Sequence, residues 1–135
     1  MKNALRITMV VVMCTLLSAC FPDRKEIRDN TWIAVSLKAS DNDSTWNPGA
    51  AYELTFPEKR GFSIQLDVNT CGGKVVFNPN NIIFFNDIFC TEACCDSPFA
   101  TELLRLLAKV NRYQFNENQM VLTGNNGITI SFVRK

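Results

Sequence analysis

The 135-residue sequence contains no histidine. Histidine is the usual general base, the usual proton switch near neutral pH and the commonest metal ligand in proteins. Without it, Ser and Thr hydroxyls lack the base that ordinarily makes them nucleophilic. The sequence also has no glycine-rich phosphate loop, nucleophile elbow or paired metal-ligand spacing. It therefore predicts a protein that is not an enzyme, with no cofactor and no bound metal.

An excess of either charge is lacking as well. The chain has 14 basic and 13 acidic residues, which gives a formal net charge of +1 at pH 7. Domains that bind nucleic acids usually show a marked basic excess gathered on one face. We therefore expect no nucleic-acid partner for this chain.

Long apolar runs are missing after the N-terminus. The one run near the N-terminus, Ile7–Leu17, follows two basic residues and is too short to span a bilayer. It ends in Leu17-Ser18-Ala19-Cys20, with small residues where a signal peptidase cuts. This pattern resembles a bacterial lipoprotein signal, in which the cysteine is acylated and becomes the mature N-terminus. An ordinary secretory signal that happens to end in cysteine is the alternative.

The lipoprotein resemblance implies a signal peptide over residues 1–19 and a mature chain of 116 residues that begins at Cys20. Loss of the leader leaves 12 basic and 13 acidic residues. Membrane contact would come from the acyl chains on Cys20, since two or more chains hold stably where one does not. The next residue is Phe21 rather than Asp, and by resemblance to Gram-negative sorting this favours the outer membrane. The domain would then face the periplasm.

Residues 20–30 carry no hydrophobic periodicity, and we expect them to be the lipidated cysteine and a polar tether. The folded domain is then expected over residues 31–135. Within it, short runs of apolar residues, several alternating with polar ones, predict eight strands. The expected strands are 31–38, 52–56, 62–68, 74–77, 82–85, 112–115, 119–123 and 128–133.

A single helix is expected between the fifth and sixth strands. Apolar residues recur at helical spacing over residues 97–110, with Asp96 or Ser97 as the N-cap and Pro98 in the first turn. Eight short strands and one helix predict a mainly β domain. We expect a small antiparallel barrel or a sandwich, with the helix covering one opening.

Four cysteines remain in the mature domain besides Cys20, namely Cys71, Cys90, Cys94 and Cys95. An even number in a small exported domain favours disulfides, for which three pairings exist. A soft metal such as Cu(I) bound by thiolates is one alternative. Thiol redox activity is another, since Cys94 and Cys95 directly precede the expected helix, where the dipole lowers a thiol pKa. The spacing is not the Cys-x-x-Cys of typical redox sites.

An ordered set of short motifs carries a family resemblance over residues 30–134. The motifs are Asn30-Thr31-Trp32, Tyr52-x-Leu-x-Phe56, Gly61, Asn69-x-Cys71-x-Gly73, Thr91-x-x-x-Cys95, Leu103-x-x-Leu106-x-x-x-Val110-x-x-Tyr113, Leu122, Gly127 and Phe132. The set resembles the META domain, the HslJ-like family of small bacterial envelope proteins. The resemblance implies the fold and a link to envelope stress, antibiotic tolerance or virulence. It implies no defined biochemical activity.

The resemblance also bears on the disulfides. The family position favours a bond between Cys71 and Cys95, which would leave Cys90 and Cys94 as a local pair. Cys94 is the alternative partner of Cys71, and a strained bond between the neighbours Cys94 and Cys95 is the other alternative. The chain departs from the family where Cys71 is followed by Gly72 instead of asparagine. Cys90 and Cys94 look like additions to the family pattern, so the usual pairing near the helix is open.

The polar segment 39–50 is expected to be a loop. Asp41 and Asp43 faintly resemble a calcium loop, but the glycine and the distal glutamate of such loops are missing. Trp46 is expected to plug one end of the barrel, with an exposed contact residue as the alternative.

Three functions fit the sequence. The first is a non-catalytic, lipid-anchored envelope protein that binds a protein or a small molecule in a stress or virulence role. The second is a thiol redox or soft-metal-handling lipoprotein that uses the four cysteines of the domain. The third is an inhibitor of an exogenous enzyme that acts through the 39–50 loop.

Overall fold

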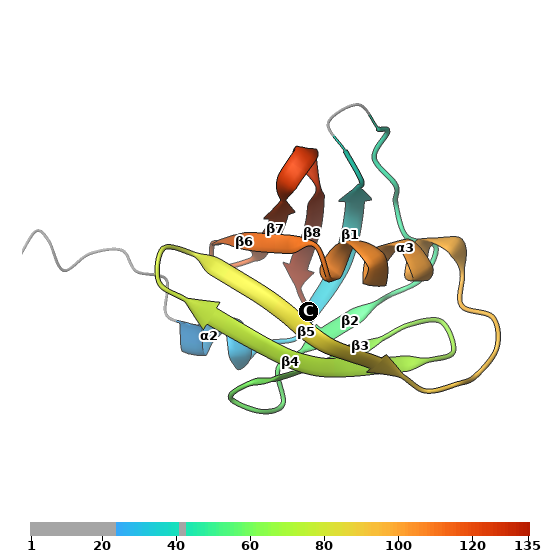
Figure 1. Ribbon diagram of the computed structural model, residues 1–135, viewed down its shortest axis with the longest axis horizontal. Helices are drawn as coiled ribbons and strands as arrows, with labels where there is room; N and C mark the ends of the chain where they lie inside the picture. Colours follow the sequence, from blue (N-terminus) through green and yellow to red (C-terminus); the bar gives the residue numbers. More distant parts are fainter. Residues whose placement is uncertain (1–23, 41–42) are drawn as a thin grey trace, which may run out of the picture.

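The computed structural model describes residues 24–40 and 43–135 of the chain. Eight strands form a closed barrel in which each strand pairs antiparallel with the next and the last closes on the first (Figure 1). The strands are β1 (Trp32–Lys38), β2 (Glu53–Thr55), β3 (Gly61–Gln65), β4 (Thr70–Asn78), β5 (Ile82–Cys90), β6 (Val110–Phe115), β7 (Gln119–Gly124) and β8 (Thr129–Arg134). A short 3-10 turn, η1 (Asn125–Gly127), joins the last two strands. The expected mainly β domain is confirmed, and of the two expected architectures the chain adopts the barrel.

The core fills the inside of the barrel. Each strand contributes at least one buried apolar side chain, because alternate residues of a strand point to the same face. Phe62 and Ile64 of β3 show the pattern, with exposed fractions of 3% and 0% on either side of the half-buried Ser63. Trp32, at the start of β1, is fully buried. Side chains packed in this way leave the loops and the outer faces as the places for a binding site.

Helix α3 (Pro98–Leu107) lies between β5 and β6 in the chain, as expected. Its N-cap is Ser97, whose hydroxyl accepts a hydrogen bond from the backbone N–H of Ala100 at 3.2 Å. The buried face of the helix packs on the barrel, and the Phe99 ring stacks on Tyr52 with ring centroids 5.1 Å apart. The helix ends at Leu107 and not at Val110 as the periodicity predicted. Val110 is buried as the first residue of β6, so the apolar spacing continues across the helix end.

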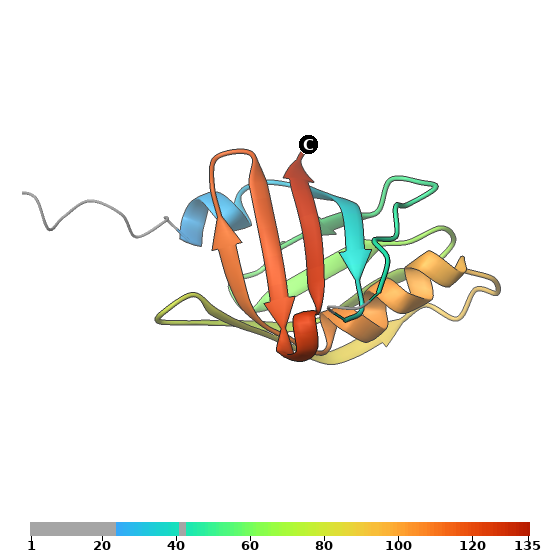
Figure 2. The ribbon, with the colours of Figure 1, turned by 90° about the horizontal axis from the view of Figure 1, so that it is seen from above.

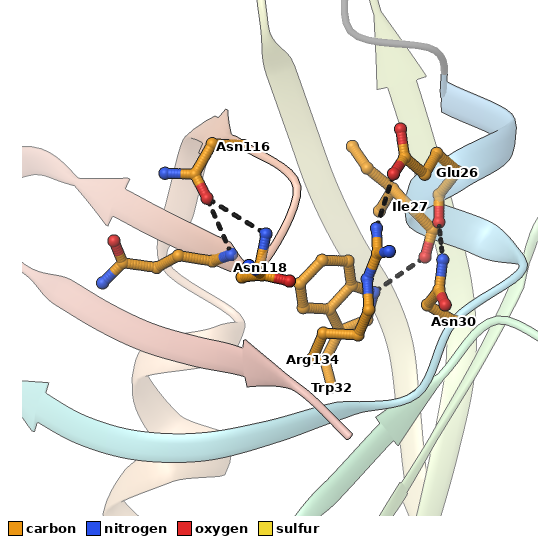
Figure 3. A network of polar contacts seen from close by, with 8 residues as sticks. Glu26, Ile27, Asn30, Trp32, Asn116, Asn118 and Arg134 are labelled. Carbon is orange, nitrogen blue, oxygen red and sulfur yellow. Dashed lines mark hydrogen bonds and ion pairs between the residues drawn. The ribbon is translucent and has the colours of Figure 1, made fainter.

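A second helix, α2 (Arg24–Arg28), stands where the sequence predicted a polar tether. Its one buried residue, Ile27, is fully enclosed, and the indole N–H of Trp32 donates a 2.8 Å hydrogen bond to the Ile27 carbonyl (Figure 3). The Arg134 guanidinium also forms a 2.6 Å ion pair with Glu26. The folded part of the chain therefore starts before residue 31. The prediction failed because a single apolar residue in a polar segment produces no periodicity.

The two helices lie at opposite ends of the barrel. Figures 1 and 2 show α2 and α3 on opposite sides of the barrel, and α2 contacts β4 through the hydrogen bond from Arg24 to the Phe77 carbonyl. Neither helix of the described residues has the length and apolar character needed to cross a bilayer. The molecule thus has two distinct ends, and the candidate sites divide between them.

A one-residue bulge fixes the pairing of β4 with β5. The register shifts between Gly72 and Lys74, so that one extra residue of β5 is accommodated opposite Gly73. A Cβ at Gly73 would lie 2.6 Å from the carbonyl oxygen of Asn86 and 2.8 Å from that of Asp87. Only glycine fits at this close approach of the two backbones.

The packing of α2 generates the first testable prediction. Ile27→Ala removes a fully buried side chain, and we expect a loss of about 2–4 kcal/mol in the free energy of unfolding. Urea denaturation of the purified chain measures it. Val133→Ala serves as the control, because Val133 is 37% exposed, and it should change stability by less than about 1 kcal/mol. Equal effects of the two substitutions would show that α2 does not belong to the core.

Candidate functional site

The four cysteines of the domain form two disulfides at the end of the barrel near α3. Cys71 pairs with Cys90, with Cα atoms 4.0 Å apart, and Cys94 pairs with its neighbour Cys95. The expected pairing of Cys71 with Cys95, and of Cys90 with Cys94, is therefore wrong. Disulfide bonding of all four residues is as the sequence predicted.

The bulge at Gly73 explains the pairing. On the far side of the bulge Lys74 lies opposite Asn86, and without the shift the same register would place Cys71 opposite Phe89. The extra residue moves Cys90 into that position instead, directly across the ladder from Cys71. A one-residue irregularity inside a strand pair leaves no signal in the spacing of cysteines.

Thiolate chemistry at this end would require reduction. All four sulfur atoms are engaged in disulfides, so none is a free metal ligand. In the described part of the chain, no group of three or more His, Cys, Asp or Glu residues is placed to hold a metal ion. Cys71 is buried with an exposed fraction of 1%, whereas Cys94 and Cys95 lie on the surface.

A buried asparagine holds the segment that carries Cys94 and Cys95. This segment, residues 91–97, is called here the cysteine link. The Asn69 side chain is 6% exposed and accepts hydrogen bonds from the Thr91 hydroxyl at 2.8 Å and the Ala93 N–H at 2.9 Å. Its amide donates to the Ala93 carbonyl at 2.7 Å and to Asp96 at 2.6 Å. Because both polar atoms of Asn69 have partners, its burial carries no unpaired-group penalty.

Two carboxylates complete this attachment. Asp96 accepts hydrogen bonds from the backbone N–H groups of Val68 and Asn69 at 3.0 and 3.3 Å, and Asp67 accepts one from the Ser97 N–H at 2.9 Å. The bond from Ser97 is the main reason that the pKa of Asp67 lies below its usual range. Burial raises the pKa of Asp96, but its bonds from Val68 and Asn69 outweigh that effect and the pKa is lowered.

Tyr52 joins the same cluster. Its hydroxyl donates to Asp67 at 2.8 Å and lies 2.9 Å from the Ser97 hydroxyl. Burial raises the Tyr52 pKa, the bond with Ser97 lowers it, and the negative charge of Asp67 raises it further. Tyr52, Asp67 and Asp96 are therefore held in fixed protonation states at neutral pH. Each is occupied in joining the cysteine link to the turn between β3 and β4.

The lowered pKa of Asp96 generates the second prediction. Asp96 binds a proton less readily in the folded state than in the unfolded state, because its pKa is lower there. The stability that the Asp96 carboxylate contributes is therefore present above the unfolded pKa of about 3.9, and it is lost as the pH falls through the lower folded pKa. Asp96→Asn should cost about 1–3 kcal/mol at pH 7, where hydrogen bonds to a charged acceptor are lost. It should also reduce the fall in stability between pH 5 and pH 3.

Chemical denaturation across this pH range checks both parts of the prediction. Glu117→Gln is the matched control, because Glu117 is an exposed acid in the turn between β6 and β7. The control should follow the unmodified chain at every pH. If the free energy of unfolding fell equally between pH 5 and pH 3 in Asp96→Asn and in the control, the attachment of the cysteine link would not depend on the Asp96 carboxylate.

A groove lies at the opposite end of the barrel, between α2, the turn before β3, and β4. It has a volume of about 760 Å³ and is called here the basic groove. Its charged lining residues are five basic and one acidic: Arg24, Lys25, Arg28, Asp29, Lys59 and Arg60. The sequence interpretation missed it, because 24–28 was taken for a tether, 59–60 lies in a turn and the whole chain is nearly neutral.

Phe77 of β4 positions two of the three arginines of the basic groove. Arg24 donates a 3.3 Å hydrogen bond to the Phe77 carbonyl, and the Arg28 guanidinium lies 4.9 Å from the centre of the Phe77 ring. The ring is itself fixed, since it packs edge-on against Phe56 and Tyr113. The Nε of Arg28 is buried and has no hydrogen-bond partner in the described residues. The groove therefore presents cationic side chains over an apolar floor.

The described part of the 39–50 loop does not close the barrel. Trp46 is 43% exposed, and its backbone pairs with Leu37 beyond the end of the β1–β2 ladder. The expectation that Trp46 plugs the barrel is therefore wrong; the core is already filled by strand and helix side chains. Asp43 is exposed, and Asp41 lies outside the described residues.

An exposed aromatic residue marks a third surface. Phe89 of β5 is 70% exposed and borders a hollow of about 540 Å³ over the outer faces of β3 and β4. Gly72 and Gly73 line this hollow with backbone atoms, since neither residue has a side chain. The sequence analysis ended this strand at Phe85, whereas β5 runs to Cys90, so it did not identify Phe89 as a surface residue of a strand.

Comparisons with known proteins agree with this fold. A family model of the META domain matches residues 25–135. A structure of a protein from Burkholderia xenovorans, solved by NMR, superimposes with a TM-score of 0.68 at 22% identity, covering 87% of this chain and 93% of that one. A crystal structure of a DUF4847 family protein from Bacteroides vulgatus gives a TM-score of 0.61 at 16% identity, covering 78% and 92%. No curated protein matches the chain.

Proposed function

Since the chain belongs to the META domain family, we propose that it is a non-catalytic, lipid-anchored protein of the bacterial cell envelope that acts by binding. One observation carries this proposal. The titratable side chains that cluster near α3 are bound to one another and to the backbone, while the basic groove leaves fixed charges open at the surface. Catalytic groups need a reacting atom within reach, whereas a binding site needs positioned charge and shape.

The anchor in this proposal is the acylated Cys20. It precedes Arg24 of α2 by only four residues, which span at most about 14 Å when fully extended. The barrel would thus be held close to the membrane surface, with the α2 end nearest to it. We place the anchor in the outer membrane with the domain facing the periplasm, in an envelope stress or virulence role.

Cys20→Ser tests the anchor. We expect the variant to remain uncleaved or to leave the membrane fraction, because serine cannot carry the thioether-linked lipid. Membrane fractionation and the intact mass of the purified protein measure both outcomes. Cys14→Ser is the control, since Cys14 lies within the expected leader. Unchanged fractionation and mass in the Cys20 variant would remove the basis for a lipoprotein.

A second candidate function is thiol exchange at the Cys94–Cys95 disulfide. The observation that favours it is exposure: both residues lie on the surface, just before the N-terminus of α3. Reduction would open the disulfide to two thiols with two electrons and two protons from two molecules of a monothiol such as glutathione, which become one disulfide. Cys71, by contrast, is buried and its disulfide is shielded on that side.

Alkylation after equilibration in glutathione buffers tests this candidate. We expect Cys94 and Cys95 to become alkylated under milder conditions than Cys71 and Cys90, with peptide mass mapping as the readout. If both disulfides resisted reduction, or if both were reduced under the same conditions, the Cys94–Cys95 disulfide would have no separate redox behaviour.

A further inference from the structure

We propose that the basic groove binds the phosphate headgroup of an anionic phospholipid in the membrane that carries the lipid anchor. The membrane source of the phosphate rests on the proposed function. The affinity of the groove for a phosphate group rests on its own geometry. The groove would seat the barrel on the bilayer in one orientation, in addition to the tether at Cys20.

Charge segregation is the first argument. Five of the 12 basic residues of the mature chain line this groove, with one acidic residue among them. The rest of the mature chain then carries 7 basic and 12 acidic residues, so the molecule is strongly polarised although its net charge is small. A surface of this kind is drawn to an anionic bilayer at its basic end.

Four of the five groove cations are also available. Among the described residues, ion pairs neutralise basic side chains elsewhere: Lys74 with Asp87, Arg105 with Glu102, Arg134 with Glu26 and Lys135 with Glu53. Within the described residues, Arg24, Arg28, Lys59 and Arg60 take part in no ion pair. Guanidinium groups bind phosphate with two parallel hydrogen bonds, which suits them to this ligand.

The position of α2 is fixed before any ligand arrives. The Trp32 indole N–H donates a hydrogen bond to the Ile27 carbonyl, and the Arg134 guanidinium donates one to the Glu26 carboxylate (Figure 3). The Asn30 side chain donates to the Glu26 carbonyl at 2.7 Å. These contacts tie the helix to β1 and β8. The arginines of α2 therefore need little ordering on binding, which lowers the entropic cost of binding an anion.

An apolar floor favours a lipid over free phosphate. Val76 of β4 lines the groove and is 38% exposed, next to Val75 and Phe77, which also line it and are buried, with exposed fractions of 0% and 8%. A headgroup that continues into glycerol and acyl chains covers such a surface, whereas an inorganic ion leaves it in water. The volume of about 760 Å³ accommodates a headgroup with its glycerol.

Binding to lipid vesicles tests the proposal. The protein used is residues 20–135, which include every residue that the structure describes. It carries Cys20→Ser, so that no acyl chain contributes to binding. We expect binding to vesicles of phosphatidylglycerol and phosphatidylcholine, and weak binding to phosphatidylcholine alone. Lys59→Gln with Arg60→Gln should weaken binding about thirtyfold, since each basic residue at an anionic surface contributes about a factor of five. Arg24→Gln alone should weaken it about fivefold.

Arg105→Gln with Lys109→Gln is the matched control, because it removes two positive charges from α3 and its C-terminal end, away from the groove. It should change vesicle binding less than twofold. Equal weakening by the two double variants would overturn the assignment to the groove. Complete displacement from the vesicles by millimolar inorganic phosphate would overturn the lipid as the source. Neither outcome depends on whether Cys20 is acylated in the cell, so failure of the anchor and failure of the groove are distinguishable.

Discussion

The indole of Trp32 is buried at one end of the barrel, and its N–H must find an acceptor there. The acceptor is the carbonyl of Ile27, so the hydrogen bond draws the segment before β1 back across the barrel end. The Phe115 ring meets the indole edge-on, with ring centroids 5.6 Å apart, and the Arg134 guanidinium lies 5.8 Å from it. Bulk water cannot take the place of this acceptor, because Trp32 and Ile27 are both 0% exposed. Helix α2, and with it one wall of the basic groove, follows from that requirement.

The other end of the molecule depends on a different constraint, the bulge at Gly73. The bulge sets which residue of β5 faces Cys71, and thereby which disulfide forms. Because Cys90 is bound to β4, the cysteine link turns back over the β3–β4 turn. There the Asn69 side chain accepts hydrogen bonds from Thr91 and Ala93 of the link. The two ends thus differ in chemistry: one holds arginines over an apolar floor, and the other holds carboxylates bonded to backbone N–H groups.

Strand and helix positions could be predicted from the sequence because their signals are local. The alternation of Phe62 and Ile64 with polar residues identified β3, and Ser97 with Pro98 identified the start of α3. The failures came from features that no local window contains. Ile27 is one apolar residue whose partners, Trp32 and the barrel end, are set by the tertiary fold. The register of β4 and β5 and the gathering of charge in the basic groove are likewise products of the closed barrel.

The ladder between β5 and β6 differs from the other ladders of the barrel. The register there has one residue pair, Ile82 with Arg112, supplemented by the hydrogen bond from the Tyr113 N–H to the Asn81 carbonyl. These strands are joined by a helix and not by a tight turn, which would bring them together as a β-hairpin with a longer ladder. Opening at this point leaves the other seven strand pairings intact and converts the barrel into one open sheet. The Cys71–Cys90 disulfide lies within that sheet and does not bridge the seam. We therefore expect local unfolding of the barrel to begin at this seam.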